Sequence, residues 1–554
     1  MTTENKTFNL LDERWIPCAM LDGTTRTLTL TEIFKEARSV ARVVGDDPLQ
    51  SASILRTLLV IFWRAQLTRG ELQDADPDTW WEDRLLKHDD GKDLDLVMDY
   101  LDDCRPRFDL LDSAVPFMQV AELRKPDESI PDVDRLMPDS ESDYFALRAG
   151  PGKQSLTFAE AARALITIHA YDYAGIKPGT VGDPRLKGGK SYPIGPGWAG
   201  WTGVAIVHGR DLAETLLYNT PAEFILEHSD TEQDLPAWER EAHTSVPRHK
   251  TEMMPDGPCD LLTWQARRVR LHWSAGEVTG ALVTNGDKVI FKNQFEDPMT
   301  AYRYSKNQSS KTTPVHMPRD LDPSLTVWKG LEALLIREDV RRSTAKDQPA
   351  DIPPETVSWI RAFQGDRNLV GKQVVVELIG IQYGAQMSSI TNTISSKIPM
   401  QLGTLMDDSA LRHKDLVDVI EQTEKAATAL GQFGGNLKDA TGDRYEFDAN
   451  LKESLLQDLS AEFTSWIASI NQESSVEGKR REWESLVREA TLSSARRLVR
   501  SSSPQTLIGK IRDTRVVSAA TAYDLLSSVL NKVLPLAHPP KQSLQTPDPE
   551  GVTA

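Results

Sequence analysis

Two short stretches of this chain have the composition of core anchors. Residues 9–17 read Asn-Leu-Leu-Asp-Glu-Arg-Trp-Ile-Pro, and residues 107–119 read Arg-Phe-Asp-Leu-Leu-Asp-Ser-Ala-Val-Pro-Phe-Met-Gln. Side chains as large and apolar as these are usually buried, and proline fixes turns. We therefore expect both stretches to hold the core together without carrying chemistry. The expected anchors are Trp15, Phe108, Phe117 and Met118, with turns at Pro17 and Pro116.

The composition is that of a soluble globular protein. The chain has 554 residues, of which 39% are hydrophobic and 26% are charged, so it can form two to four domains. The longest apolar stretch, residues 55–62, is interrupted by Arg56 and is far shorter than the roughly 20 residues that span a bilayer. The first residues lack the basic and apolar regions of a secretory signal. We expect a cytoplasmic protein with no membrane partner.

Cysteine and histidine spacing gives no sign of a metal or redox site. Cys18, Cys104 and Cys259 are scattered without a CxxC pair, so we expect free thiols and neither disulfides nor zinc. The ten histidines form no HExxH or HD pattern, and His169 and His208 lie in apolar segments typical of core or edge positions. The sequence therefore predicts no metal, no cofactor and no catalytic residues.

Charge is distributed unevenly along the chain. The formal net charge is -18, which is unusual for a protein that touches nucleic acid. Residues 122–143 hold eight acidic and three basic residues, whereas residues 145–200 hold seven basic and three acidic ones. This segregation predicts one basic region on an otherwise acidic protein. The alternative is a solvated acidic surface with chance basic runs.

Periodicity predicts a mixed first part of the chain. Residues 50–69 have helical length and amphipathic spacing, and Trp80-Trp81 should anchor the next element. Long irregular loops are expected at residues 121–153 and 177–200. Other predicted elements are a helix at 158–171 opened by a Thr157–Glu160 capping box, strands at 204–208 and 373–382, and strands within 267–291 joined by a hairpin turn, for which Asn285-Gly286 is typical.

The later part of the chain has helical patterns. They cover residues 411–431, 447–470, 477–500 and 506–533, with breaks that include Gly434-Gly435. Short connections between such segments predict an antiparallel four-helix bundle. The expected fold class is α+β: a mixed N-terminal domain at 1–400, the bundle at 401–535 and a disordered tail at 536–554.

The two anchor stretches resemble the opening and the FDL…PFMQ block of the CasA family, the large subunits of the type I-E CRISPR surveillance complex Cascade. The resemblance implies a non-catalytic subunit that recognises the protospacer-adjacent motif (PAM) in double-stranded DNA and promotes duplex opening and R-loop formation. Its implied partners are the other Cascade subunits, crRNA, target DNA with its displaced strand, and a recruited helicase-nuclease. The alternatives are a metal-dependent nuclease and a purely structural ribonucleoprotein subunit.

The resemblance also places a DNA wedge at the turn that follows the strand at 373–382. Gln386 falls on the family's wedge glutamine, and Ala385 and Met387 replace flanking residues of other members. An amide side chain on a tight turn can stack on a base pair and hydrogen-bond to its edge, which is the physical basis for this assignment.

Two further PAM-facing elements follow from the resemblance. A lysine that enters the minor groove corresponds to Lys306, with Lys311 as the alternative. A glycine loop corresponds to Gly188 and Gly189, with residues 195–197 as the fallback; Lys187 and Lys190 would contact phosphates. This loop ends like a Walker A motif but has the wrong spacing, so we do not expect it to bind ATP.

Two more groups are expected to contact nucleic acid or neighbouring subunits. The resemblance implies that Phe145, Arg148 and Lys153 belong to a loop that docks on crRNA and an adjacent subunit, although Phe145 could instead lie in the core. Arg488, Arg496 and Arg500 fall on one helix face that could guide displaced single-stranded DNA. A salt-bridged, solvated face is the alternative.

Overall fold

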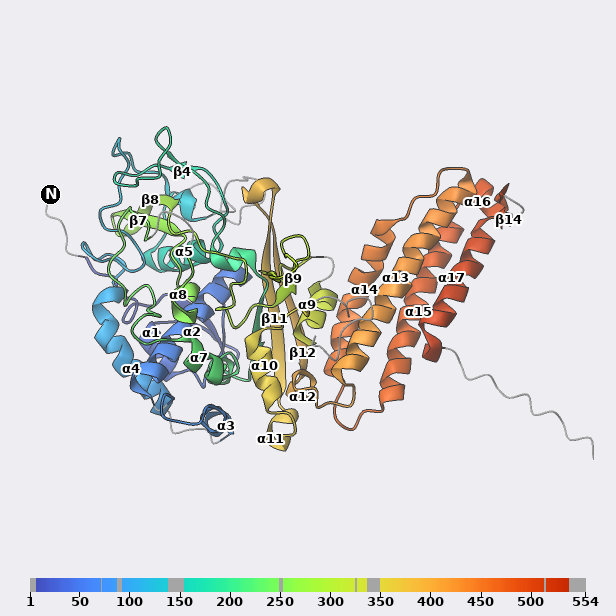
Figure 1. Ribbon diagram of the computed structural model, residues 1–554, viewed down its shortest axis with the longest axis horizontal. Coiled ribbons are helices and arrows are strands. Elements are labelled where there is room, and N and C mark those ends of the chain that lie inside the picture. The colour runs from blue at the N-terminus through green and yellow to red at the C-terminus, as the bar shows by residue number, and fades with distance from the viewer. Residues whose placement is uncertain are drawn as a thin grey trace, which may run out of the picture. The chain divides into compact units, whose positions relative to one another are not determined.

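The computed structural model describes residues 6–70, 72–86, 92–137, 154–248, 253–323, 326–335, 349–512 and 515–537. The chain divides into two compact units, Met1–Asp408 and Ser409–Ala554. The first unit mixes helices with small sheets and the second is mainly helical, which confirms the predicted α+β class (Figure 1).

The strands of the first unit form small antiparallel sheets. The three-stranded sheets have the orders β2-β1-β3 and β12-β11-β6, and the remaining strands pair as β4–β5, β7–β8 and β9–β10. Their bounds are β1 Ile16–Met20, β2 Thr25–Leu28, β3 Val40–Val43, β4 Lys177–Pro178, β5 Lys190–Ser191, β6 Val204–His208, β7 Arg267–Ser274, β8 Glu277–Asn285, β9 Tyr302–Tyr304, β10 His316–Pro318, β11 Gln373–Tyr383 and β12 Ile390–Gln401.

The first unit also contains helices of varied length. The α-helices are α1 Leu30–Lys35, α2 Pro48–Arg69, α3 Pro77–Leu86, α4 Lys92–Cys104, α5 Phe158–Tyr171, α6 Leu212–Tyr218, α7 Ala222–His228, α8 Pro258–Leu262, α9 Thr326–Leu335, α10 Glu355–Ala362, α11 Arg367–Val370 and α12 Leu402–Leu405. Short 3-10 helices are η1 Arg105–Phe108, η2 Val133–Leu136, η5 Trp198–Trp201 and η8 Ala385–Met387.

Helix α2 is the central element of the first unit. Its N-cap is Asp47, whose side chain accepts a hydrogen bond from the amide of Gln50, and Pro48 supplies the favoured first helical residue. The predicted helix is confirmed, but the expected amphipathic pattern is wrong, because every residue from Leu49 to Leu67 except the half-buried Ser51 is buried. A helix buried on every face must satisfy its polar side chains internally.

The two anchor stretches pair with each other. Asn9 and Asp109 form an antiparallel bridge, and the amide of Leu10 donates to the carbonyl of Phe108 at 3.0 Å. Trp15 and Phe108 are fully buried, and the rings of Phe108 and Phe117 stack with centroids 5.2 Å apart. The prediction that these stretches are core anchors is confirmed, because backbone pairing joins them and their large side chains are buried. The turn expected at Pro17 is wrong, because Pro17 lies within β1 and pairs with Thr27 of β2.

Strand β11 runs through the middle of the sheet that carries the turn at residues 384–389, which is predicted to act as a wedge and is named the wedge turn for that prediction. It pairs with β12 along its whole length and with β6 from Val375 to Ile379. The segment around Thr300 adds a bridge to Val204 on the other side of β6. The strands predicted at 204–208 and 373–382 are confirmed, and β12 was not predicted.

The β7–β8 hairpin differs from the prediction. Its turn is Ala275-Gly276, where both residues have positive φ, and Asn285 ends β8 instead of opening a turn. Residues 288–291 contribute one isolated parallel bridge, Met253 to Val289, and no strand. The Asn-Gly signal fails here because the chain keeps pairing past Asn285: the amides of Gly286 and Asp287 donate to the carbonyls of Ala266 and Gln265 at 2.8 and 3.1 Å.

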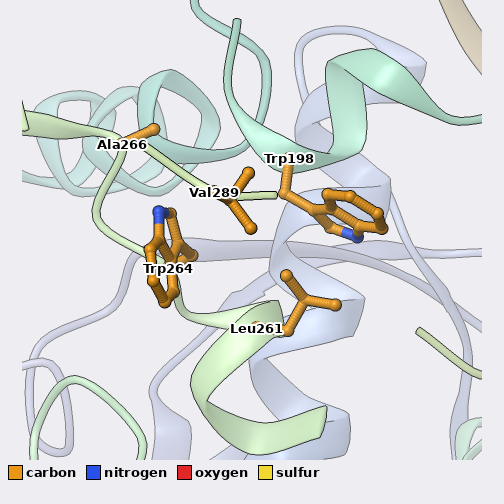
Figure 2. Close-up of a cluster of buried hydrophobic side chains, with 5 residues drawn as sticks. All are labelled: Trp198, Leu261, Trp264, Ala266 and Val289. Carbon is orange, nitrogen blue, oxygen red and sulfur yellow. The ribbon is translucent and has the colours of Figure 1, made fainter. Parts of the chain in front are cut away.

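A buried ion pair joins α2 to the segments that follow. Nη2 of Arg56 lies 2.9 Å from Oδ2 of Asp297, and their side chains are 3% and 0% exposed. The indole Nε1 of Trp198 donates to the same oxygen at 2.8 Å. Trp198 also packs in an apolar cluster, which Figure 2 shows: Trp198, Leu261, Trp264, Ala266 and Val289.

The second unit consists mainly of four long helices, which Figure 1 shows aligned side by side: α13 His413–Thr441, α14 Ala449–Ala468, α15 Val476–Arg500 and α17 Ala519–Val533. The expected break at Gly434-Gly435 is wrong, because α13 continues through it. A Cβ on Gly434 or Gly435 would lie 2.6 Å from Leu451 or Tyr445, so these glycines permit close packing.

The fourth predicted helix is also shorter than expected. This part of the chain contains α16 Pro504–Ile508 and two paired strands, β13 Lys510–Arg512 and β14 Arg515–Val517, and α17 begins only at Ala519. Pro535–Ala537 forms a final 3-10 turn, η9. The tail predicted to be disordered lies outside the described residues from His538 onward.

Some sequence expectations about chemistry can be compared directly with the structure. All three cysteines are free thiols, as predicted, and burial raises the pKa of Cys18 to about 12. His169 is buried, as predicted, and desolvation lowers its pKa to about 4. Among the described helices, none is long and apolar enough to cross a membrane.

The buried ion pair should dominate the stability of the first unit. Asp297→Ala leaves the Arg56 guanidinium buried without its partner, so we expect the free energy of unfolding to fall by about 3–5 kcal/mol. Urea titration followed by tryptophan fluorescence measures this change. Arg14→Ala, which removes the exposed Arg14–Glu32 pair, is the control and should leave the midpoint nearly unchanged; an equal loss in both variants would contradict the central role of Asp297.

Candidate nucleic-acid interface

The wedge turn projects from the β11–β12 hairpin, the long gold ribbon in Figure 1. Gln386 and Ala385 are exposed, and Met387 is half-buried. Gln386 and Met387 both have φ of 56°, in the left-handed region that side chains other than glycine rarely adopt. Two consecutive residues in this region store strain, which is typical of functional loops.

Backbone hydrogen bonds hold this strained turn. The amide of Gly384 donates to the carbonyl of Ser389 at 2.9 Å, and the amide of Met387 donates to the carbonyl of Gly384 at 3.0 Å. The hydroxyl of Ser388 donates to the carbonyl of Ala385 at 2.8 Å. The turn is therefore a defined structure that presents the Gln386 amide at its tip.

Tyr383 fixes the base of the turn. Its hydroxyl donates to the carbonyl of Tyr171, at the end of α5, at 2.5 Å. Burial raises the pKa of Tyr383 well above its ordinary value, so the hydroxyl keeps the proton that it donates. A Cβ on Gly200 would lie 2.2 Å from the Tyr383 hydroxyl, so the glycine in η5 is required for this contact.

The glycine loop is a tight two-residue turn. Lys187 and Lys190 pair through both backbone hydrogen bonds, at 3.1 and 3.2 Å, and Gly188 and Gly189 between them have φ of 58° and 72°. This conformation requires positive φ at both central positions, which explains the two glycines. All four residues are exposed, so the turn offers bare backbone between two lysines.

Buried charges hold the segment that leads into and out of this turn. The Arg267 guanidinium ion-pairs with Asp172, donates to the carbonyls of Tyr173 and Gly195, and is fully buried. Nζ of Lys177 lies 2.7 Å from the same Asp172 carboxylate. Arg185, a nearby cation, is paired with Asp183 and is therefore part of the support rather than the exposed turn.

The fallback position for the glycine loop has a packing role. Gly197 is buried, and a Cβ there would lie 2.4 Å from the backbone of Ala170. Gly195 has φ of 104°, and a Cβ on it would lie 2.9 Å from the Trp201 ring. These glycines let the chain pack beneath the loop, whereas Gly188 and Gly189 face open space.

Lys306 and Lys311 lie on one exposed loop between β9 and β10. The amide of Ser305 donates to the carbonyl of Val315 at 2.8 Å and closes this loop. Both lysine side chains are exposed. The loop follows Asp297, whose carboxylate is fixed by Arg56 and Trp198.

These three elements share one support, the 3-10 helix η5. Trp198 of η5 donates a hydrogen bond to Asp297, which precedes the Lys306 loop. Gly200 of η5 packs under Tyr383, at the base of the wedge turn. Gly197, at the end of the glycine-loop segment, directly precedes η5. Sequence reasoning missed this support. The Trp198-Ala-Gly-Trp201 motif is its only local signal, because every partner is distant in sequence.

The arginines of the second unit differ in their surroundings. The Arg488 guanidinium donates to the Asn531 side chain at 2.9 Å, and Arg496 forms an exposed ion pair with Glu489. Arg500 is exposed at the end of α15. Exposed ion pairs are weak, so Arg496 can exchange its partner for a phosphate at little cost.

The expected docking loop cannot be placed, because Phe145, Arg148 and Lys153 lie outside the described residues. Within the described ranges, no group of three or more His, Cys, Asp or Glu side chains is arranged to hold a metal ion.

Comparison with known proteins gives a consistent result. Residues 9–494 match the family described as CRISPR-associated protein Cse1. The Thermus thermophilus protein CasA/Cse1 is 30% identical over 270 residues, and the match spans 48% of this chain and about half, 49%, of that protein. The crystal structure of Thermobifida fusca Cse1 is 33% identical, with a TM-score of 0.84 over 97% of this chain and 100% of the other.

A more distant match shows the same fold. A chain of a CRISPR RNA-guided surveillance complex is 17% identical, with a TM-score of 0.58 over 95% of both chains.

The contact between Gly200 and Tyr383 predicts how the wedge turn can be loosened. In Gly200→Ala, the new Cβ displaces the Tyr383 hydroxyl, so hydrogen exchange of the amides at residues 383–391 should accelerate about tenfold. This acceleration corresponds to a decrease of ~1.4 kcal/mol in the free energy of local opening. Gly371→Ala is the matched control, since a Cβ there has no neighbour within 4 Å. Unchanged exchange in Gly200→Ala would show that Tyr383 does not fix the turn.

Proposed function

Because the chain belongs to the CRISPR-associated protein Cse1 family, we propose that it is the non-catalytic large subunit of a crRNA-guided antiviral surveillance complex of the Cascade type. In this role it recognises the PAM in double-stranded DNA, promotes duplex opening and R-loop formation, and recruits a helicase-nuclease. The fold that it shares with a chain of a CRISPR RNA-guided surveillance complex supports the assembly part of this proposal.

The exposed, strained Gln386 turn is the observation that carries the DNA-opening role. An inserted side chain must resist the stacking energy of a base step, a few kcal/mol, without folding back. The backbone hydrogen bonds of the turn and the Tyr383 anchor supply that resistance. Gln386 acts as the wedge, and Ala385 and Met387 shape the turn beside it.

The glycine turn and the lysine loop act on the minor groove beside the wedge. Gly188 and Gly189 allow the backbone to approach the groove, Lys187 and Lys190 contact the phosphates, and Lys306 enters the groove. Because the minor groove distinguishes bases poorly, this subunit accepts several PAM sequences. Base pairing with the crRNA then reads the rest of the target.

The remaining parts of the chain bind the complex and the displaced strand. Phe145, Arg148 and Lys153 dock on crRNA and a neighbouring subunit, and Arg488, Arg496 and Arg500 guide the displaced strand. The net charge of -18 restricts nucleic-acid binding to these local basic elements and discourages binding elsewhere.

The wedge assignment predicts a selective binding defect. In Cascade reconstituted with Gln386→Ala, binding to a closed duplex that carries a PAM should weaken about tenfold, because ~1–3 kcal/mol of stacking is lost. A target with a pre-opened bubble should bind normally, since it needs no wedge. Electrophoretic mobility shift with both targets measures this.

Gln382→Ala is the matched control, since Gln382 is an exposed glutamine on the same hairpin. It should leave both targets unaffected. If Gln386→Ala bound closed and bubble targets like the wild type, the turn would not be the wedge and a structural role for the subunit would be favoured.

The lysine assignment can be tested by salt dependence. Removing a lysine that contacts the DNA backbone or groove should reduce the slope of log K against log salt by about 1. We expect Lys306→Ala to show this reduction and Lys311→Ala, on the same loop, to keep the wild-type slope. The reverse result would transfer the groove contact to Lys311.

A further inference from the structure

A cavity of about 290 Å³ lies on the face of the β6–β11–β12 sheet, away from the wedge turn. Its other walls come from the end of β3, the start of α2 and helix α6. Glu377, in the cavity, is six residues from Tyr383, which corresponds to about 20 Å along an extended strand. The PAM-facing elements described above do not use this cavity.

The sheet side of the cavity carries linked polar groups. Nε2 of His208 lies 2.8 Å from Oε2 of Glu377, and the Ser395 hydroxyl donates to Oε1 at 2.9 Å. Nζ of Lys397, on the same strand as Ser395, lies 3.6 Å from Oε1. Burial raises the pKa of Glu377, but the hydrogen bond and charge of His208, with Lys397, outweigh burial and lower it. Glu377 is therefore a deep, ionised hydrogen-bond acceptor.

Exposure increases from this carboxylate toward the cavity mouth. The side chain of Glu377 is 10% exposed, that of His208 18% and that of Lys397 47%. Arg42, at the end of β3, is also exposed. The cavity thus has a carboxylate on its inner side and two cations near solvent. This arrangement suits a ligand that has an anionic group at one end and hydrogen-bond donors at the other end.

The other acidic residues that line the cavity are already engaged. Asp47 caps α2 by accepting a hydrogen bond from the amide of Gln50 at 2.8 Å, and the Asp46 carboxylate lies 3.6 Å from the Arg163 guanidinium. Glu377 is likewise paired, with His208 and Lys397. Because the carboxylates that line the cavity already have partners, the positive charge of Arg42 favours an anionic ligand. The apolar walls come from Leu55, Ile206, Leu212 and Ile379, among other residues.

We propose that this cavity binds a nucleoside monophosphate unit, either as a free nucleotide or as one nucleotide of a single strand. Arg42 and Lys397 bind the phosphate, and Glu377 accepts hydrogen bonds from the sugar hydroxyls or the base edge. The base lies against Ile206 and Ile379. The volume is close to the lower bound for ligand pockets, which fits a ligand as small as one nucleotide.

The test uses the full chain without other subunits. Equilibrium dialysis with AMP and UMP measures free nucleotides, adenosine and uridine report binding without the phosphate, and a 12-nucleotide single-stranded DNA reports strand binding. Arg42→Gln and Lys397→Gln should each weaken nucleotide binding about tenfold, the effect of losing one charge-assisted contact, and should leave nucleoside binding unchanged.

Lys425→Gln is the matched control. Lys425 is an exposed lysine that pairs with a glutamate, as Lys397 does, but it lies on α13 in the second unit. Its removal should leave all ligands unaffected, and thermal unfolding of each variant verifies folding.

Either source of the ligand supports the site. Weakened binding of AMP or UMP in the Arg42 and Lys397 variants identifies free nucleotides, and weakened binding of the oligonucleotide alone identifies a strand. If no ligand binds, or if the two substitutions change binding no more than Lys425→Gln does, the proposal is overturned. This result would not affect the proposed PAM recognition, which is measured on assembled Cascade.

Discussion

The packing of the first unit depends on the hydrogen bonds that the Asp297 carboxylate accepts. Its Oδ2 binds both the Arg56 guanidinium of α2 and the Trp198 indole of η5. Since α2 is buried along its length, the Arg56 charge needs a partner inside the protein. That requirement brings the Asp297 segment and η5 to the same side of α2. The exposed loops then take their positions from η5, so one buried carboxylate orients elements that lie on the surface.

Local signals made much of the fold predictable. The α5 helix has a Thr157–Glu160 capping box that forms as expected, and β11 is a run of β-branched residues that forms a strand. Predictions failed where packing overrides local preference. Gly434-Gly435 suggested a break, yet α13 continues through it, and the two glycines let Leu451 and Tyr445 pack closely against the helix. Asn285-Gly286 suggested a turn, yet Ala275-Gly276 forms it.

The candidate site was predictable only in part. The resemblance to a known family pointed to Gln386 and to the glycine loop, and the structure adds that both are exposed tight turns. Their support was beyond sequence reasoning, because its contacts join distant residues: Trp198 meets Asp297 across 99 positions, and Tyr383 meets Tyr171 across 212. No periodicity or motif reports such pairs. Single residues that look unremarkable in sequence, such as Gly200, are the ones that hold the site.

The β11–β12 hairpin is supported at two separate places along β11. Strand β6 pairs with β11 only from Val375 to Ile379, so the hairpin extends four residues further, about 13 Å, before Tyr383 clamps it again. A force on the tip is therefore resisted at two places, the pairing with β6 and the Tyr383 contact, and can bend only the short stretch of strand between them. Because strand faces alternate with period two, relatives can change the reach of the tip only by adding residue pairs to both strands. The part of the hairpin beyond β6 can therefore lengthen in steps of about 7 Å while the buried contacts beneath it stay the same.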